Sequence, residues 1–235
     1  MKRILFFLLV MIAVLSMSRP AMAILYDRGS FSYDDGAGNT GIVNLIYDKD
    51  FDITWVGDGN FAQTTCFDVD GKMTWFEADA WARGLTIGGS TDWRLPTSLN
   101  QDGSGPVGAF HATGSEMGHL YSGELGGAYS LISASSDPDL GLFPNLKDYR
   151  YWSGTETLSG VTTLAWNFDF SKDLQSANHH QSGFFYALAV HSGDVGAAPV
   201  PEPATVALLG IGLVGMAVAE VRRRRKKEMQ LIIAK

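Results

Sequence analysis

Histidine and carboxylate side chains are the groups in this sequence that could bind metals or move protons, but none stands in a recognisable site motif. The five histidines are His111, His119, His179, His180 and His191. None has the spacing of zinc motifs built from paired histidines or cysteines. We therefore expect His119 to be a packing residue of a helix and the pair His179–His180 to lie in an exposed loop. The sequence predicts no catalytic, cofactor-binding or metal-ligating residue.

Two short runs of aspartates offer carboxylates at alternating positions, which Ca²⁺ could use. Asp48, Asp50 and Asp52 form the first run, and Asp68 and Asp70 form the second. Neither run has the glycine and the distal glutamate at the positions that an EF-hand loop requires. Asx-turns, in which an aspartate accepts a backbone N–H two residues on, explain both runs. Calcium stays an alternative, and we predict no bound cofactor.

Nucleophiles are equally scarce. Cys66 is the single cysteine, so the chain cannot form an internal disulfide, and we expect this residue to be a small buried hydrophobe. The sequence contains no serine-centred nucleophile elbow and no glycine-rich phosphate loop. We therefore predict that the protein is not an enzyme.

Arg94 lies in an apolar stretch, between Trp93 and Leu95-Pro96. A guanidinium in such a place needs a carboxylate or several carbonyls to offset its desolvation. We expect a structural ion pair inside the fold. The alternative is an arginine that binds a ligand.

The N-terminus is typical of a secretory signal peptide. Lys2 and Arg3 form its positive end, an apolar run follows, and Ala21 and Ala23 form a small-x-small cleavage site. We expect signal peptidase to cut there, so that the mature chain begins at Ile24. An uncleaved anchor is the less favourable alternative, because the apolar run is too short to span a membrane comfortably.

The C-terminal end carries a second targeting pattern. The motif Pro201-Glu202-Pro203 precedes an apolar run over residues 204–221, and six consecutive cations occupy residues 222–227. As a helix the run spans about 27 Å, close to the thickness of a hydrocarbon core. We therefore predict a transmembrane helix over the apolar run. The cations hold its far end in the cytoplasm, so the preceding chain must lie outside.

This C-terminal pattern resembles the PEP-CTERM sorting signal, and the resemblance covers residues 200–227. It implies that an exosortase cuts near the Pro-Glu-Pro motif and releases or re-anchors the exported part. Residues 228–235 depart from the pattern, because such signals usually stop at the basic cluster. We expect a membrane-anchored precursor that reaches the cell surface or the exterior after processing.

The exported part is strongly acidic. The whole chain carries a net charge of −7, whereas residues 24–200 hold 8 Lys and Arg against 22 Asp and Glu, a balance of −14. Binding to nucleic-acid phosphates needs clustered cations, so we exclude nucleic acid as a partner. The charge could attract divalent cations or basic partners, or it could serve solubility alone.

Two helices are predicted in the first half of the exported part. Thr74 and Glu77 form a capping box, and an apolar face with helical spacing follows until Gly88-Gly89. The second helix covers residues 115–125, where Gly126 supplies the stop.

Strands are predicted from alternating and continuous apolar residues. Residues 42–47 and 53–56 form two of them. The segments 164–170 and 184–190 are predicted to pair antiparallel, joined by the polar stretch 171–183. Helices followed by an antiparallel sheet indicate the α+β class.

An ordered series of motifs between residues 42 and 194 resembles the Lcl C-terminal domain family, an exported bacterial family of unknown biochemical function. The motifs lie at residues 73–75, 88–96, 116–120, 151–155 and 165–168. The resemblance implies a C-type-lectin-like fold with two helices and a loop-rich antiparallel sheet. It also implies structural roles for the motif residues Trp75, Trp93, Arg94, Leu95, Pro96, Tyr151, Trp152 and Trp166.

The segment Trp166-Asn167-Phe168-Asp169 is loosely similar to the calcium and sugar motif of C-type lectins. Phe168 breaks the spacing of that motif, and its acidic companion motif is missing. We therefore predict no lectin-type calcium site and expect Asn167 and Asp169 to form the solvent face of a strand.

The sequence as a whole predicts an exported surface or extracellular-matrix protein that binds polysaccharide or surfaces without catalysis. Tyr149, Tyr151 and Trp152 form a candidate ligand face, since aromatic rings stack on sugars; the alternative is that they belong to the core. Rival functions are a protein-interaction module on the cell surface and a cryptic enzyme. The expected layout is a signal peptide over 1–23, an N-terminal segment over 24–41, the Lcl-like domain over 42–194, a linker over 195–200, the sorting signal over 201–227 and a cytoplasmic tail over 228–235.

Overall fold

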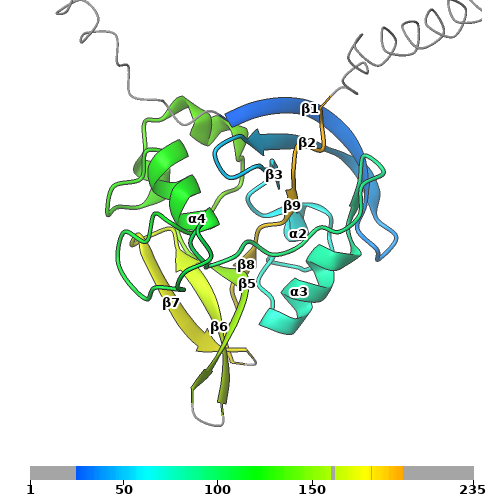
Figure 1. The fold of residues 1–235 in the computed structure, drawn as a ribbon. Coiled ribbons are helices and arrows are strands. Elements are labelled where there is room, and N and C mark those ends of the chain that lie inside the picture. The colour runs from blue at the N-terminus through cyan, green and yellow to red at the C-terminus, as the bar shows by residue number, and fades with distance from the viewer. Residues whose placement is uncertain (1–24, 160–161, 181, 198–235) are drawn as a thin grey trace, which may run out of the picture. The chain divides into compact units, whose positions relative to one another are not determined.

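The computed structural model describes residues 25–159, 162–180 and 182–197 (Figure 1). The signal peptide, the Pro-Glu-Pro motif, the predicted membrane helix and the basic cluster fall outside these ranges. Within them, no helix is long and apolar enough to span a bilayer. The described residues up to Gly196 belong to one compact unit.

One layer is a five-stranded sheet in which all neighbouring strands run antiparallel. Its strands, in spatial order, are β4 (Thr86–Ile87), β1 (Leu25–Asp34), β2 (Thr40–Asp48), β3 (Ile53–Val56) and β9 (Val190–Ser192). The strands predicted over residues 42–47 and 53–56 are β2 and β3. The predicted domain start at residue 42 is too late, because β1 pairs with β2 along most of its length. No residue of β1 is fully buried. The strand therefore lacks the apolar pattern from which it could have been predicted.

The second layer is a four-stranded sheet. Its strands, in spatial order, are β7 (Leu174–His179), β6 (Thr162–Asp169), β5 (Arg150–Ser159) and β8 (Tyr186–Ala187). β8 runs parallel to β5, and the other neighbours are antiparallel.

The predicted pairing of residues 164–170 with 184–190 is wrong. β6 pairs instead with β7, which lies within the polar stretch that was expected to be a loop. The segment 184–190 is divided: β8 joins the second sheet, and β9 begins at its end and joins the first. Alternation identifies a strand but not its partner, and here one apolar segment links both sheets.

Within the described residues, three α-helices, two 3₁₀ turns and one π-helical turn lie between these strands. They are α2 (Phe61–Thr64), α3 (Trp75–Gly84), α4 (Glu116–His119), the π-helical turn η1 (Leu120–Glu124), and the 3₁₀ turns η2 (Ile132–Ala134) and η3 (Pro138–Leu142). The predicted capping box of α3 is confirmed: Thr74 N donates to Glu77 Oε2 at 2.9 Å, and Glu77 N donates to Thr74 Oγ1 at 3.4 Å. The helix ends at Gly84, earlier than predicted, because Leu85 is already extended. The architecture is α+β with more strand than helix.

The core consists of two clusters of buried side chains that meet at β5. Trp152 packs in the cluster that holds α3 and Trp93, whereas Tyr151 packs with the π-helical turn and Phe168. Successive strand residues point to opposite faces, so these two neighbours enter different clusters. Figure 1 shows α3 and α4 on either side of this centre. The helix α4 and its π-turn therefore pack in a cluster that they share with strands of both sheets.

The junction with the predicted linker is also part of the domain. Arg28 Nε donates to Asp194 Oδ1 at 2.9 Å. Val195 packs against the first core cluster. The predicted linker start at residue 195 is therefore too early, since Val195 is anchored to the domain.

Candidate functional site

The aromatic residues chosen from the sequence as a ligand face do not form one. Tyr151 and Trp152 are fully buried. Tyr151 Oη donates to the carbonyl of Gly59 at 2.8 Å, and Trp152 Nε1 donates to the carbonyl of Met73 at 2.9 Å. Neither ring can stack on a sugar, and Tyr149 alone of the three is exposed, at 43%. The two neighbours point to opposite faces of β5, and each face is covered by a different core cluster at this position, which the sequence does not reveal.

The motif residues that the family resemblance marks as structural are mostly in the core. Buried among them are Trp75, Trp93, Leu95, Pro96, Tyr151 and Trp152. Trp166 is half-buried. The ring of Trp166 lies 3.5 Å from the position that a Cβ on Gly108 would take, so it lies against the loop around that glycine.

Arg94 forms the ion pair that its apolar setting led us to expect. Its Nη1 and Nη2 donate to the carboxylate of Glu116 at 2.9 and 2.7 Å. The same carboxylate accepts the backbone N–H of Thr97 at 2.7 Å. Glu116 is buried, so the pair ties the segment after Trp93 to the first residue of α4.

Two further expectations about polar residues are wrong. Asn167 and Asp169 are buried at 0% and 3% exposure, not solvent-facing. Asn167 Nδ2 donates to the carbonyl of Ser176, and Asp169 Oδ1 accepts the backbone N–H of Ser171. They serve the β6–β7 pairing and the turn between these strands, which sequence reasoning had not recognised as a turn.

Cys66 and His180 also differ from expectation. Cys66 is exposed and takes a positive φ of 60°, since it lies in the tight turn after α2. His180 is 6% exposed rather than in an exposed loop. Its ring stacks on Trp75 at 4.7 Å between centroids. The burial of His180 follows from packing against a distant part of the chain, which local composition does not reveal, whereas the exposure of Cys66 follows from its local turn.

The two aspartate runs form Asx-turns, as predicted. Asp68 Oδ1 accepts the backbone N–H groups of Asp70 and Gly71 at 3.0 and 2.7 Å. Asp48 Oδ1 likewise accepts those of Asp50 and Phe51 at 3.0 and 3.2 Å. In the first run, however, one aspartate has a second role.

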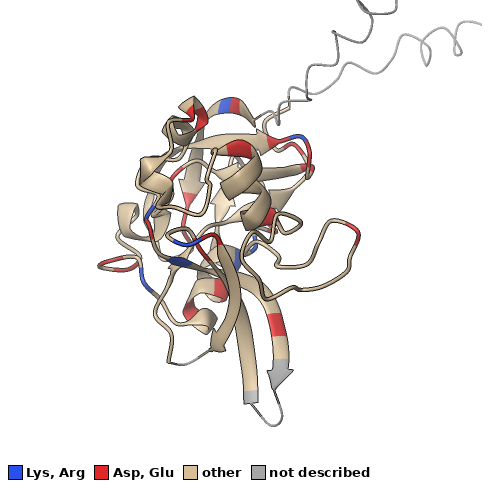
Figure 2. Ribbon diagram, turned by 90° about the vertical axis from the view of Figure 1, so that its left-hand side faces the viewer, with Lys and Arg blue, Asp and Glu red and all other residues tan. Residues whose placement is uncertain are grey.

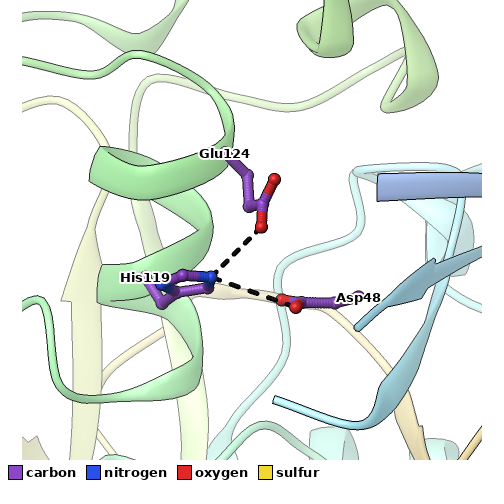
Figure 3. Close-up of side chains that lie close together, drawn as sticks. All are labelled: Asp48, His119 and Glu124. Atoms are coloured by element: carbon purple, nitrogen blue, oxygen red, sulfur yellow. Dashed lines mark hydrogen bonds and ion pairs between the residues drawn. The ribbon is translucent and has the colours of Figure 1, made fainter. Parts of the chain in front are cut away.

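Asp48, His119 and Glu124 converge in a buried cluster that the sequence did not predict (Figure 3). His119 Nε2 lies 3.1 Å from Glu124 Oε1 and 3.9 Å from Asp48 Oδ1. One ligand atom from each residue lies within 4.8 Å of the other two. Both carboxylate side chains are 0% exposed, and the imidazole is 16% exposed. This arrangement could hold a metal ion or share protons.

A π-helical turn brings two of these residues together. His119 ends α4, and Glu124 ends η1. In an α-helix, residues five apart point in different directions, whereas the wider π-turn places them on nearly the same side. Leu125 N donates to the carbonyl of Leu120 at 2.9 Å, which closes the i to i+5 turn. A Cβ on Gly123 would lie 3.0 Å from two atoms of the imidazole, so this glycine leaves room for the ring.

Burial perturbs all three members of the cluster. It raises the pKa of Asp48 and of Glu124, because a carboxylate out of water loses solvation. Burial by itself would lower the pKa of His119. The hydrogen bond to Glu124 and the charge of Asp48 outweigh burial and raise that pKa. Perturbed groups of this kind concentrate at functional sites.

Sequence reasoning missed the cluster for two reasons. Asp48 is far from the other two residues along the chain, and only the packing of the β2–β3 turn against α4 brings it close. The pair at positions i and i+5 does not match helical motif spacings. The one available signal was His119 on a predicted helix close to Glu124, and it was read as packing.

A second feature is a groove open to solvent with a volume of about 530 Å³, lined by residues 100–102, 107, 109 and 111–114. The ring of His111 stacks on Tyr129 at 5.0 Å between centroids, with 26° between the planes. Tyr129 and Phe110 are 64% and 60% exposed. Neither ring is among the lining residues: Tyr129 is connected to the groove through its stack on His111, and Phe110 lies in the chain between the lining residues Ala109 and His111. The sequence analysis did not select these aromatic residues as a ligand face.

Backbone and side-chain bonds anchor the groove loop to β7. His111 N donates to the carbonyl of Asp173 at 2.8 Å, and Gln175 N donates to that of Ala109 at 3.0 Å. His111 Nδ1 also lies 2.9 Å from the buried carboxylate of Asp173. His111 has a positive φ of 58°, and these contacts hold it in that conformation.

Comparison with known proteins identifies the C-terminal signal. Residues 199–225 match the family model described as the PEP-CTERM protein-sorting motif. No curated protein and no solved structure is significantly similar to the chain. The match lies outside the described residues and agrees with the predicted sorting signal. The chain therefore carries a PEP-CTERM protein-sorting motif and is an exosortase-targeted surface protein.

Proposed function

We propose that the exported domain is a non-catalytic, C-type-lectin-like domain that binds neutral polysaccharide at the cell surface or in the extracellular matrix. Signal peptidase and exosortase would process it on the way. The observation that carries the proposal is the exposed His111–Tyr129 stack beside a groove of about 530 Å³.

Exposed aromatic rings favour a sugar ligand. Tyr129 and Phe110 each leave more than half of their surface in solvent. Aromatic rings provide large contact areas, and tyrosine adds a polar group. The apolar faces of sugar rings match such surfaces, and Asn100, Gln101 and Asp102 in the groove wall supply hydrogen-bonding groups for the hydroxyls.

The charge of the domain favours a neutral ligand. Figure 2 shows Asp and Glu along much more of the described ribbon than Lys and Arg. The groove itself contains Asp102 and no lysine or arginine among its lining residues. An anionic polymer would be repelled by this surface, whereas a neutral glycan would not.

The groove geometry supports binding without catalysis. Small-molecule sites usually enclose most of their ligand, whereas an open groove lets a polymer pass through. His111 and Asp173 resemble two members of a hydrolase triad, which also needs a nucleophile on the second ring nitrogen. Among the described residues, His111 has a side-chain hydrogen bond to Asp173 alone.

Binding of the full-length protein, in detergent, to the producer's own exopolysaccharide and to a neutral glucan tests the proposal. We expect Tyr129→Ala and Phe110→Ala to weaken binding about tenfold or more, the equivalent of roughly 1.4 kcal/mol. Phe184→Ala is the matched control, since Phe184 is 56% exposed but, unlike Phe110, is not next in the chain to any residue that lines the groove. If all three variants bind like the unchanged protein, the groove is not the site. Release of sugar reducing ends by the unchanged protein would show catalysis instead.

A further inference from the structure

We propose that Asp48, His119 and Glu124 bind one divalent transition-metal ion of the Zn²⁺ class. This goes beyond the proposed function, since the cluster lies apart from the lining of the groove. It also departs from the sequence analysis, which predicted no metal ligand.

The spacing of the ligand atoms suits such an ion. Zn²⁺ binds imidazole nitrogen and carboxylate oxygen at about 2.0–2.2 Å, so neighbouring ligands of a tetrahedral site lie roughly 3.4 Å apart. The distances from His119 Nε2 to Glu124 Oε1 and to Asp48 Oδ1 are 3.1 and 3.9 Å. Small side-chain shifts therefore suffice to place three ligands around one ion.

Unpartnered buried oxygens point to a missing ligand. Asp48 Oδ2 and Glu124 Oε2 are buried and accept no hydrogen bond of ordinary geometry. The indole of Trp55, whose Nε1 is also buried without a partner, interacts with Asp48 from within the protein. Figure 3 shows the carboxylate of Asp48 facing the imidazole. A buried carboxylate oxygen without a hydrogen bond is costly. The oxygens nearest His119 Nε2 are the other two, Asp48 Oδ1 and Glu124 Oε1, so a cation removes that cost where it binds each carboxylate through both of its oxygens.

Charge balance favours a doubly charged ion over a proton. A protonated His119 carries one positive charge against two carboxylates. Among the described residues, no lysine or arginine forms an ion pair with Asp48 or Glu124. A divalent ion with neutral imidazole and two carboxylates makes the buried site neutral, whereas the protonated site keeps one negative charge.

The mixture of ligands selects the class of ion. Ca²⁺ and Mg²⁺ prefer oxygen ligands, and Ca²⁺ takes six to eight of them. Imidazole suits Zn²⁺ and its first-row neighbours. Asp48 is already oriented by the backbone N–H groups of Asp50 and Phe51. The ring of Phe51 packs on the imidazole at 4.5 Å between centroids, so two of the three ligands are preorganised.

A metal here would fasten the β2–β3 turn to α4 and its π-turn. Sites with three protein ligands leave a fourth position for water. His119 is the partly exposed member, at 16%, and provides the side from which an ion can enter. The turn that it would fix also carries Asp50, whose carbonyl accepts a hydrogen bond from Gln101 Nε2 in the groove wall at 2.6 Å.

Thermal unfolding of the full-length chain, without a histidine tag and after removal of metals by a chelator, tests the proposal. We expect Zn²⁺ at a hundredfold excess over its Kd to raise the Tm by about 5 °C or more. Ca²⁺ and Mg²⁺ should leave the Tm within about 1 °C. Calorimetric titration should give one Zn²⁺ per chain.

Isosteric variants separate this site from adventitious binding. Glu124→Gln and Asp48→Asn keep the shape of each side chain and remove its charge, and each should weaken Zn²⁺ binding at least tenfold. His179→Gln is the control, because His179 is an exposed histidine outside the cluster. The proposal is overturned if Zn²⁺ leaves the Tm of the unchanged protein unaltered, or if Glu124→Gln gains as much from Zn²⁺ as the unchanged protein does.

Discussion

Two contacts between carboxylates and basic side chains lie at the ends of the short helix α4, and they differ in how completely the carboxylate oxygens are hydrogen-bonded. At its first residue, both oxygens of Glu116 accept hydrogen bonds, from Arg94 and from the backbone of Thr97. At its last residue, His119 meets Glu124 and Asp48, and each of these carboxylates keeps one buried oxygen without a partner. In the first contact both carboxylate oxygens accept hydrogen bonds. In the second, each carboxylate has one oxygen that a ligand could still use.

This difference separates a structural ion pair from a candidate binding site. A buried charge is tolerated when a partner and hydrogen bonds compensate its desolvation. Glu116 meets that condition with protein groups alone. Asp48 and Glu124 do not meet that condition. Burial is the main cause of their raised pKa values, which reflects the same incomplete compensation of the buried charge. Mutations at the two ends of α4 should therefore differ in how strongly they lower the free energy of unfolding.

The largest effect on stability is expected at the end of α4 where Arg94 pairs with Glu116. Arg94→Ala leaves the buried carboxylate of Glu116 without a countercharge, and should lower the free energy of unfolding by ~3 kcal/mol or more. Urea unfolding of the purified protein measures the change. If the variant unfolds at the same urea concentration but binds polysaccharide less well, Arg94 belongs to a ligand site, and the contrast between the two ends fails.

Asp35 extends the comparison, because it is a second buried carboxylate that is fully satisfied. Its Oδ1 accepts the backbone N–H groups of Ala37 and Asn39, each at 2.9 Å, and its Oδ2 accepts the Asn39 amide at 2.7 Å. Burial alone would raise the pKa of Asp35, but the hydrogen bonds outweigh burial and lower it. Asp35 and Asp48 are thus aspartates at opposite ends of β2 whose pKa values move in opposite directions.

The lowered pKa gives Asp35 a defined pH dependence. Its stabilising contribution is present above the ordinary aspartate pKa of about 4 and is lost as the pH falls through the lowered folded-state value. We expect Asp35→Ala to reduce the free energy of unfolding by about 1–2 kcal/mol near pH 7. The difference from the unchanged protein should shrink below about pH 4. Urea unfolding at both pH values checks this, and a pH-independent difference would contradict it.

The two ends of α4 also differ in how much of each contact can be predicted from the sequence. The need of Arg94 for a partner follows from its apolar neighbours, although the identity of Glu116 does not. The capping box of Thr74 and Glu77 is local and was predicted correctly. The segment 184–190 and the burial of His180 depend on contacts between distant parts of the chain, and both were assigned wrongly.

The buried cluster depends on two features that the sequence does not reveal: a long-range contact and a local change in helix type. Asp48 reaches His119 only through the packing of a strand end against a helix. Glu124 reaches it only because the helix widens into a π-turn. No residue pattern near Gly123 predicts this turn. A functional site is where local rules are expected to fail, and the cluster lies where the helical spacing breaks.

The smallest effect, and the sharpest test of the comparison, is expected for Glu124→Gln without metal. One carboxylate is enough to balance one imidazolium, and Asp48 remains 3.9 Å from His119 Nε2. The glutamine carbonyl can still accept the hydrogen bond that Glu124 Oε1 accepts at 3.1 Å. A neutral amide costs less to bury than a carboxylate that lacks full compensation, and Asp48 remains as a partner of the imidazole, so we expect the free energy of unfolding to change by less than about 0.5 kcal/mol. Glu116→Gln, the matched change at the other end of α4, should cost about 2 kcal/mol, because it weakens a charge-assisted pair with Arg94. Urea unfolding of both variants in chelator measures the contrast. Equal losses would mean that the cluster is as complete as the Arg94 pair and needs no further ligand.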